Sequence, residues 1–139
     1  MHYRFLLIFS LIFLVSCKQS IKETDLYNLN GYWEIEKVIL PDGEEKEYKA
    51  SDSYDFFKFE NKKGFRKKMM PQVDGSYLTN GIEETFTVTN EEGKYYINYS
   101  TQYAKWKEEI LNLSKEELIV KNKSDLEYHY KRPIPFTKK

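Results

Sequence analysis

The side chains that most often carry acid–base or metal chemistry are scarce in this sequence. Apart from His2 near the start, the one histidine is His129, and the one cysteine among 139 residues is Cys17. A zinc site needs three or four His, Cys or carboxylate ligands, and a nucleophilic triad would depend on His129 alone. Alternation turns His129 away from Tyr128 and Tyr130, which indicates a surface position. The sequence therefore predicts no catalytic residue and no metal site.

Carboxylates occur as adjacent pairs along the chain. The pairs are Glu44-Glu45, Glu83-Glu84, Glu91-Glu92, Glu108-Glu109 and Glu116-Glu117. Neighbouring residues of a strand point to opposite faces, so the members of such a pair do not converge on one substrate as acid and base. The six glycines fall singly, without a glycine-rich phosphate loop. We interpret the pairs as solvated surface and expect a protein that is not an enzyme and binds no cofactor.

One dense basic cluster stands out between two expected strands. It comprises Lys62, Lys63, Arg66, Lys67 and Lys68. A hairpin whose charged strands discourage edge pairing is one interpretation. Contact with anionic headgroups or acidic glycans is the other, because each basic residue near a charged membrane contributes about 1 kcal/mol. Lys and Arg together number 22 and so do Asp and Glu, which argues against nucleic acid as a partner.

Residues 1–16 have the three parts of an export signal. A short basic start precedes an apolar run from Phe5 to Val15, which is shorter than the roughly 20 residues that a spanning helix needs. Residues 14–17, Leu-Val-Ser-Cys, resemble the lipobox of bacterial lipoproteins, which implies cleavage before Cys17 and acylation of its thiol. An ordinary secretory signal followed by a chance cysteine is the alternative. We expect attachment to a bacterial membrane, the outer membrane in preference to the inner.

The chain after Cys17 is long enough for one domain. Residues 17–28 are polar and lack alternation, so they read as the lipidated N-terminus and a tether. Short β-rich runs separated by turn signals then follow, as in an antiparallel sandwich or barrel. We expect strands near 32–40, 44–49, 54–60, 65–70, 76–79, 83–89, 94–101, 106–113, 118–121 and 126–132, with a hairpin loop at 61–64. Residues 104–113 could instead hold a short helix.

Aromatic side chains alternate with polar ones along several of these runs. The aromatics expected on the inner face are Phe57, Phe59, Phe86, Tyr95, Tyr99, Tyr128 and Tyr130. Alternation of this kind is typical of a sheet with one buried face, and a closed sheet also removes exposed edges. These residues either form the core or provide walls for a small hydrophobic ligand.

The run Gly31-Tyr32-Trp33 resembles the Gly-x-Trp signature of the lipocalins. The order of turns and hairpins over residues 29–132 is similar to the lipocalin-like domains of small bacterial envelope lipoproteins. The resemblance implies an all-β, antiparallel up-and-down barrel of about eight to ten strands, with Gly31 and Trp33 at its closed end. It also implies a basic residue of the last strand across Trp33, for which Arg132 and Lys131 are the candidates. Pro133 and Pro135 make residues 133–139 an extended C-terminal tail in place of the usual helix.

Two functional hypotheses follow from these observations. The first is a membrane-anchored envelope lipoprotein whose lipocalin-like barrel binds a small hydrophobic ligand. The second is a structural or protein-interaction module of the cell envelope, with a solid barrel core and an envelope protein as its partner. A cavity approaching about 300 Å³ distinguishes the first from the second.

Overall fold

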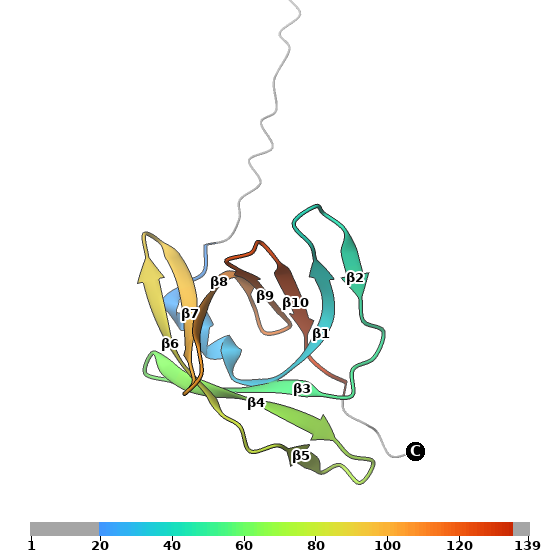
Figure 1. The fold of residues 1–139 in the computed structure, drawn as a ribbon. Coiled ribbons are helices and arrows are strands. Elements are labelled where there is room, and N and C mark those ends of the chain that lie inside the picture. The colour runs from blue at the N-terminus through green and yellow to red at the C-terminus, as the bar shows by residue number, and fades with distance from the viewer. Residues whose placement is uncertain (1–19, 135–139) are drawn as a thin grey trace, which may run out of the picture.

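The structure is a computed structural model, and it describes residues 20–134. One 3-10 helix and ten strands follow one another along the chain (Figure 1). The elements are η1 (Glu23–Leu29), β1 (Gly31–Ile39), β2 (Glu45–Glu47), β3 (Tyr54–Glu60), β4 (Lys63–Pro71), β5 (Tyr77–Thr79), β6 (Glu84–Glu91), β7 (Lys94–Ser100), β8 (Lys105–Leu113), β9 (Glu117–Asn122) and β10 (Glu127–Lys131).

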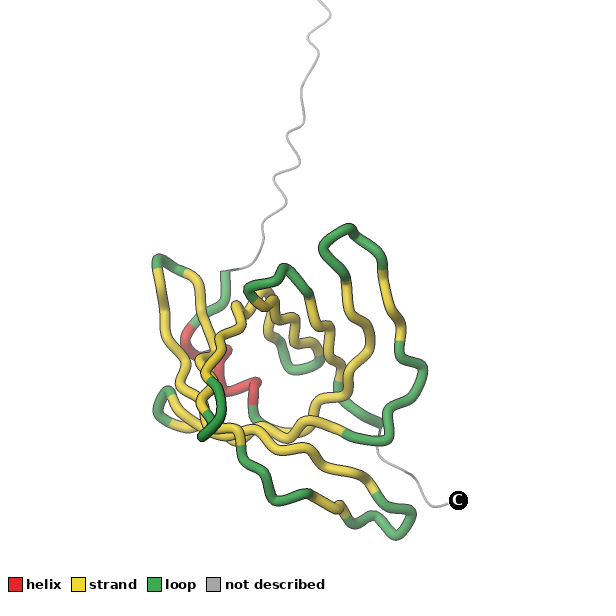
Figure 2. Tube along the Cα trace, in the orientation of Figure 1, coloured by secondary structure: helices red, strands yellow, loops and turns green. Residues whose placement is uncertain are grey.

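All pairings in the sheet are antiparallel, and eight of the strands form a closed ring. The order runs β10-β9-β8-β7-β6-β4-β3-β1, and β10 pairs with β1 from Glu34 opposite Lys131 to Ile39 opposite Glu127. Strands β2 and β5 lie outside the ring, as short hairpin partners of β1 and β4. Figure 2 shows the ring of strands in yellow, with η1 in red inside its outline. The predicted up-and-down barrel of eight to ten strands is confirmed.

Two local predictions differ from the structure. Residues 105–113 form β8, so the alternative of a helix at 104–113 is wrong. Gly64 lies within β4, whereas Asn61 and Lys62 both have positive φ and make the two-residue turn between β3 and β4. A Cβ on Gly64 would lie 1.8 Å from the carbonyl oxygen of Lys58, so the close approach of the two strands requires glycine.

The folded part begins earlier than the sequence indicated. Residues 23–29 form η1, and its Leu26 and Leu29 are buried in the main core, with Ile21 packed against it. Residues 21–28 therefore pack on the barrel, and the predicted tether at 17–28 is wrong for this part of it. The signal peptide, Cys17 and residues 135–139 lie outside the described residues. Residues 133 and 134 carry no regular secondary structure.

The core fills the barrel from the end that η1 covers. Its side chains are Leu26, Leu29, Trp33, Phe57, Phe59, Phe86, Val88, Ile97, Tyr99, Ile110, Leu113, Leu118, Val120 and Tyr130. Five of the seven predicted inner aromatics belong to this core, and Tyr95 and Tyr128 are partly buried against it. Aromatic pairs such as Phe86–Tyr99 and the stacked Phe59–Phe86 reinforce the packing. The inward alternation was therefore predicted correctly, and most of these rings contact other side chains.

Candidate functional site

The end of the barrel at η1 is sealed by Trp33 and Arg132. The indole of Trp33 is fully buried, and its Nε1 donates a hydrogen bond of 2.9 Å to the carbonyl oxygen of Leu29. The guanidinium carbon of Arg132 lies 3.6 Å from the Trp33 ring centroid, close enough for a cation–π interaction. Gly31 has a φ of +110°, and a Cβ there would come within 3.2 Å of Arg132 Nη1. Arg132, not Lys131, is thus the basic residue across the tryptophan.

Arg132 also ties three chain segments together. Its nitrogens donate hydrogen bonds to the carbonyl oxygens of Asn28 (2.7 Å), Tyr32 (3.0 Å) and Lys115 (2.8 Å). These bonds join the end of η1, the start of β1 and the β8–β9 turn at one point. Side chains and hydrogen bonds thus close this end of the barrel.

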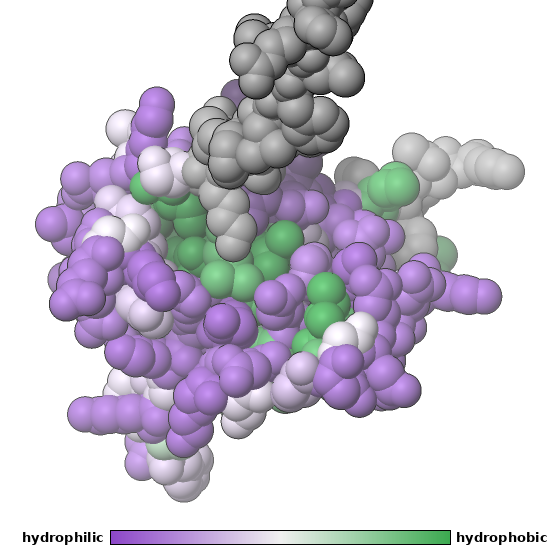
Figure 3. Space-filling view, turned by 90° about the horizontal axis from the view of Figure 1, so that it is seen from above, coloured by the Kyte–Doolittle hydropathy of each residue, from purple (hydrophilic) through white to green (hydrophobic). Residues whose placement is uncertain are grey.

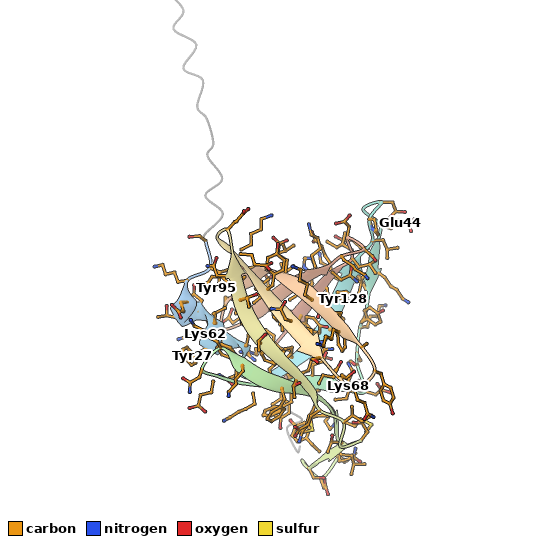
Figure 4. The ribbon with its side chains drawn as sticks, turned by 60° about the vertical axis from the view of Figure 1, so that its left-hand side comes forward. Tyr27, Glu44, Lys62, Lys68, Tyr95 and Tyr128 are labelled. Carbon is orange, nitrogen blue, oxygen red and sulfur yellow. The ribbon has the colours of Figure 1, made fainter. Side chains whose placement is uncertain are left out.

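The opposite end holds a polar pocket inside the barrel. Its volume is about 250 Å³, and its lining is Asp55, Arg66, Lys68, Trp106, Glu108, Asn122, Tyr128 and Tyr130. In Figure 4, Lys68 and Tyr128 lie at one end of the barrel, and Tyr27, Lys62 and Tyr95 lie toward the other. We call this cavity the inner pocket.

Strand alternation explains why these side chains point inward. Asp55 is two residues before the core residue Phe57 on β3, and Glu108 is two residues before the core residue Ile110 on β8. Arg66 lies opposite Glu84 in the pairing of β4 with β6. The polar residues therefore extend the same inward rows that form the core, one step closer to the open end.

Arg66 is the most heavily bonded member of this group. Its Nε and Nη2 donate hydrogen bonds of 3.0 and 3.1 Å to the two carboxylate oxygens of Glu84. Its Nη1 donates to the hydroxyl of Tyr99 at 3.3 Å, and its guanidinium carbon lies 4.4 Å from the centroid of that ring. A guanidinium that is hydrogen-bonded to a carboxylate through two nitrogens and also lies over an aromatic ring has a well-defined position.

Two carboxylates complete the group. The Asp55 side chain is 7% exposed and forms an ion pair of 2.8 Å with Lys68 Nζ. The Glu108 side chain is 8% exposed and lies 3.8 Å from Arg66 Nη1. Burial raises the pKa of Glu108, and the charge of Arg66 opposes that rise. Burial also raises the pKa of Tyr99 and of Tyr130, so both phenols stay protonated at neutral pH.

The basic residues that are clustered in the sequence point in different directions in the structure. Two glutamates from separate parts of the sequence lie together with Arg66 inside the barrel. Of the basic cluster, Arg66 and Lys68 face the inner pocket, whereas Lys67 faces outward and pairs with Glu83 at 2.9 Å. The cluster therefore belongs to the β3–β4 hairpin, as one of its two interpretations expected, but its side chains do not form one continuous surface patch. Glu84 and Glu108, expected to be solvated, lie inside the barrel.

Only part of the predicted ligand wall reaches the inner pocket. Tyr128 and Tyr130 line it, whereas Tyr95 lies at the η1 end beside Leu26. Trp106, which the sequence analysis did not select, lines the pocket and stacks on Tyr99 at 5.1 Å. His129 faces away from the pocket and lies 3.2 Å from Glu127.

A larger groove of about 820 Å³ lies on the outer surface of β4, β6, β7 and β8. Exposed side chains such as those of Thr87 and Lys107 border it. The side chains of Phe86 and Tyr99, on the same strands, point the other way into the core. The buried charges lie in the inner pocket, so we take that pocket as the candidate site.

Viewed from above, the surface is largely hydrophilic, with hydrophobic side chains gathered near its centre (Figure 3).

A sequence profile described as a lipocalin-like domain matches residues 29–120. The chain belongs to the lipocalin-like family. No curated protein matches the sequence. Two solved structures, a lipocalin-like protein from Bacteroides uniformis and an uncharacterized protein from Bacteroides eggerthii, each share 11% identity with it at a TM-score of 0.47. The first covers 76% of this chain and 98% of its own, and the second 76% and 99%.

Apocrustacyanin C2 is a further similar structure, with 11% identity and a TM-score of 0.47 over 84% of this chain and 67% of its own.

Within residues 20–134 of the lipocalin-like chain, no group of three His, Cys, Asp or Glu side chains is placed to hold a metal ion. The same residues include no helix that is long and apolar enough to cross a membrane.

Proposed function

We propose that this lipocalin-like protein is an envelope lipoprotein, anchored through Cys17, that binds a small molecule in its inner pocket. The observation that carries the binding role is the cavity itself, about 250 Å³ in volume and reached from the end opposite the Trp33 seal. That volume approaches the lower limit of about 300 Å³ for ligand sites. Trp106, Tyr128 and Tyr130 offer rings for the hydrophobic part of the ligand.

The chemistry of the pocket favours binding over catalysis. Its charged groups lie beside partners of opposite charge, as Arg66 does with Glu84 and Asp55 with Lys68, and this suits the recognition of a polar ligand. The lipobox resemblance at residues 14–17 supports the membrane anchor, and the preference for the outer membrane remains part of this proposal.

Native mass spectrometry of the full chain, purified from its own bacterium, tests the binding role. We expect a retained small-molecule mass on the wild type that is lost in Trp106→Ala, because that substitution removes one wall of the pocket. Tyr103→Ala is the matched control, since Tyr103 is 89% exposed and does not line the inner pocket. If wild type and control both carry no extra mass, the binding role is wrong.

One observation favours the second hypothesis, a protein-interaction module. Phe57, Phe59 and Phe86, predicted as possible ligand walls, are at most 4% exposed and pack on one another. Side chains thus fill the η1 end of the barrel, as that hypothesis requires. A ligand-free mass together with a reproducible protein partner would support it.

A further inference from the structure

The charges around the inner pocket do not cancel. Asp55, Glu84 and Glu108 contribute three carboxylates, and Arg66 and Lys68 contribute two cations. Both carboxylate oxygens of Glu84 accept hydrogen bonds from Arg66, so these two residues satisfy each other. Lys68 offsets one of the two remaining carboxylates, so Asp55, Glu108 and Lys68 together leave one net negative charge for a ligand.

These two carboxylates are buried, and neither is hydrogen-bonded to Arg66 as Glu84 is. Asp55 relies on Lys68, whose side chain is 56% exposed and extends from the strand toward solvent. The cationic atom nearest to Glu108 is Arg66 Nη1, and the 3.8 Å between them exceeds hydrogen-bond distance. The hydrogen-bond partner of Glu108 is the neutral hydroxyl of Tyr99. An ion pair with a lysine that is 56% exposed contributes little stability, because holding a long exposed side chain in one geometry costs entropy.

The aromatic side chains of the pocket favour the same kind of ligand. Trp106, Tyr128 and Tyr130 line the cavity together with the two carboxylates. The face of an aromatic ring attracts a cation with about 0.5 to 2 kcal/mol, and the same ring packs against an apolar group. A cation with an apolar body would thus find both of its halves accommodated in one cavity.

We propose that the inner pocket binds a small organic amine, with its ammonium group at Asp55 and Glu108 and its apolar body on Trp106, Tyr128 and Tyr130. The Lys68 ammonium occupies the position of the ligand's cation at Asp55 and swings out to solvent when the amine binds. This inference rests on the proposed binding function and specifies its ligand class.

Three probes with a shared apolar part test the inference. They are 2-phenylethylamine, 2-phenylethanol and 3-phenylpropanoate, titrated calorimetrically into the full chain at neutral pH. We expect the amine to bind about tenfold more tightly than the other two, since only the amine pairs with the carboxylates. Asp55→Asn and Glu108→Gln should each weaken amine binding about tenfold and leave alcohol binding unchanged.

Lys68→Met makes a test that misfolding cannot imitate. Removing the competing cation should tighten amine binding several-fold, whereas a damaged fold would weaken it. Lys67→Met is the matched control, because Lys67 directly precedes Lys68 on β4 and faces outward. This substitution should leave amine binding unchanged. Circular dichroism checks that each variant is folded.

Two results would overturn amine recognition in distinguishable ways. Equal binding of the three probes, or tighter binding of the carboxylate, shows that the pocket binds ligands but does not select cations. Binding of none of them also refutes the amine, and the retained mass on the purified wild type then decides separately whether the proposed binding function holds.

Discussion

Single side chains divide the two ends of this barrel into a seal and a pocket. Arg132 bonds to backbone carbonyls of three segments and lies over Trp33, so its charge is used for closure. Arg66 is bonded to Glu84 and lies over Tyr99, so its charge positions side chains at the pocket. Both arginines combine hydrogen bonds with a contact to an aromatic ring. Their roles differ because they lie at opposite ends of the barrel.

Replacing Arg132 by methionine should destabilise the protein by about 2 to 4 kcal/mol. The change keeps most of the apolar stem but removes the cation–π contact and three charged hydrogen bonds, each of which is typically worth 1 kcal/mol or more. Urea unfolding followed by far-UV circular dichroism measures the loss. Lys131→Gln is the control, and a comparable loss in that variant would show that charge at this end, not the bonded geometry, matters.

Glu108→Gln should change the pH dependence of stability. Burial raises the pKa of Glu108, so the folded state holds its proton more tightly than the unfolded state does. The folded state therefore binds more protons in the range above the ordinary glutamate pKa, and the free energy of unfolding falls as pH rises through it. Gln resembles the protonated form and lacks this decline.

Urea unfolding of wild type and Glu108→Gln between about pH 4 and pH 8 measures the effect. We expect the free energy of unfolding of the wild type to fall relative to that of the variant as pH rises. Curves that stay parallel across this range would show that Glu108 keeps its ordinary pKa in the folded protein.

The sequence predicted the sealed end better than the pocket. The tripeptide at Gly31 and the single basic pair at the end of β10 specify local features, and a short motif is enough to place them. The pocket depends on which member of each Glu pair faces inward, and β8 carries the signal in Trp106, Glu108 and Ile110 at alternate positions. A buried carboxylate in an inward row is rare without a partner, and Arg66 on a distant strand could not be assigned to it from spacing alone.

At the scale of elements, η1 is the part that the sequence analysis misplaced. Its polar composition suggested a tether, because helical or strand periodicity does not show in a segment of seven residues. Its Leu26 and Leu29 pack in the core, so η1 closes this end of the barrel. Trp33 and Arg132 both bond to its last turn, so closure depends on this short helix.

Leu29→Ala should therefore destabilise the protein by about 2 to 5 kcal/mol, as removal of a large buried side chain usually does. Leu29 is fully buried. Thr24→Ala, at an exposed position of the same helix, should change the free energy of unfolding by less than about 0.5 kcal/mol. Chemical unfolding of both variants tests this, and similar losses would mean that η1 contributes through its backbone only.

At the scale of the whole molecule, the barrel is asymmetric along its axis. Apolar side chains fill the end at η1, and charged side chains occupy the end at the inner pocket. The proposed lipid site at Cys17 is four residues before Ile21, which packs on the core. Four residues span at most about 14 Å, so an anchored barrel lies close to the membrane. The η1 end is then the nearer one, and the pocket opens away from the lipid.

The anchor itself is tested by Cys17→Ser in a bacterial host. Wild type should incorporate labelled palmitate and enter the detergent phase of a Triton X-114 partition, since each buried methylene of an acyl chain contributes about 0.8 kcal/mol. The Cys17→Ser variant should do neither, and Lys18→Ala, which keeps the thiol, should behave as wild type. Because the pocket lies at the far end from the anchor, amine binding should be the same in the wild type and Cys17→Ser. Palmitate label on the Cys17→Ser variant would place the anchor elsewhere and remove the basis for this orientation.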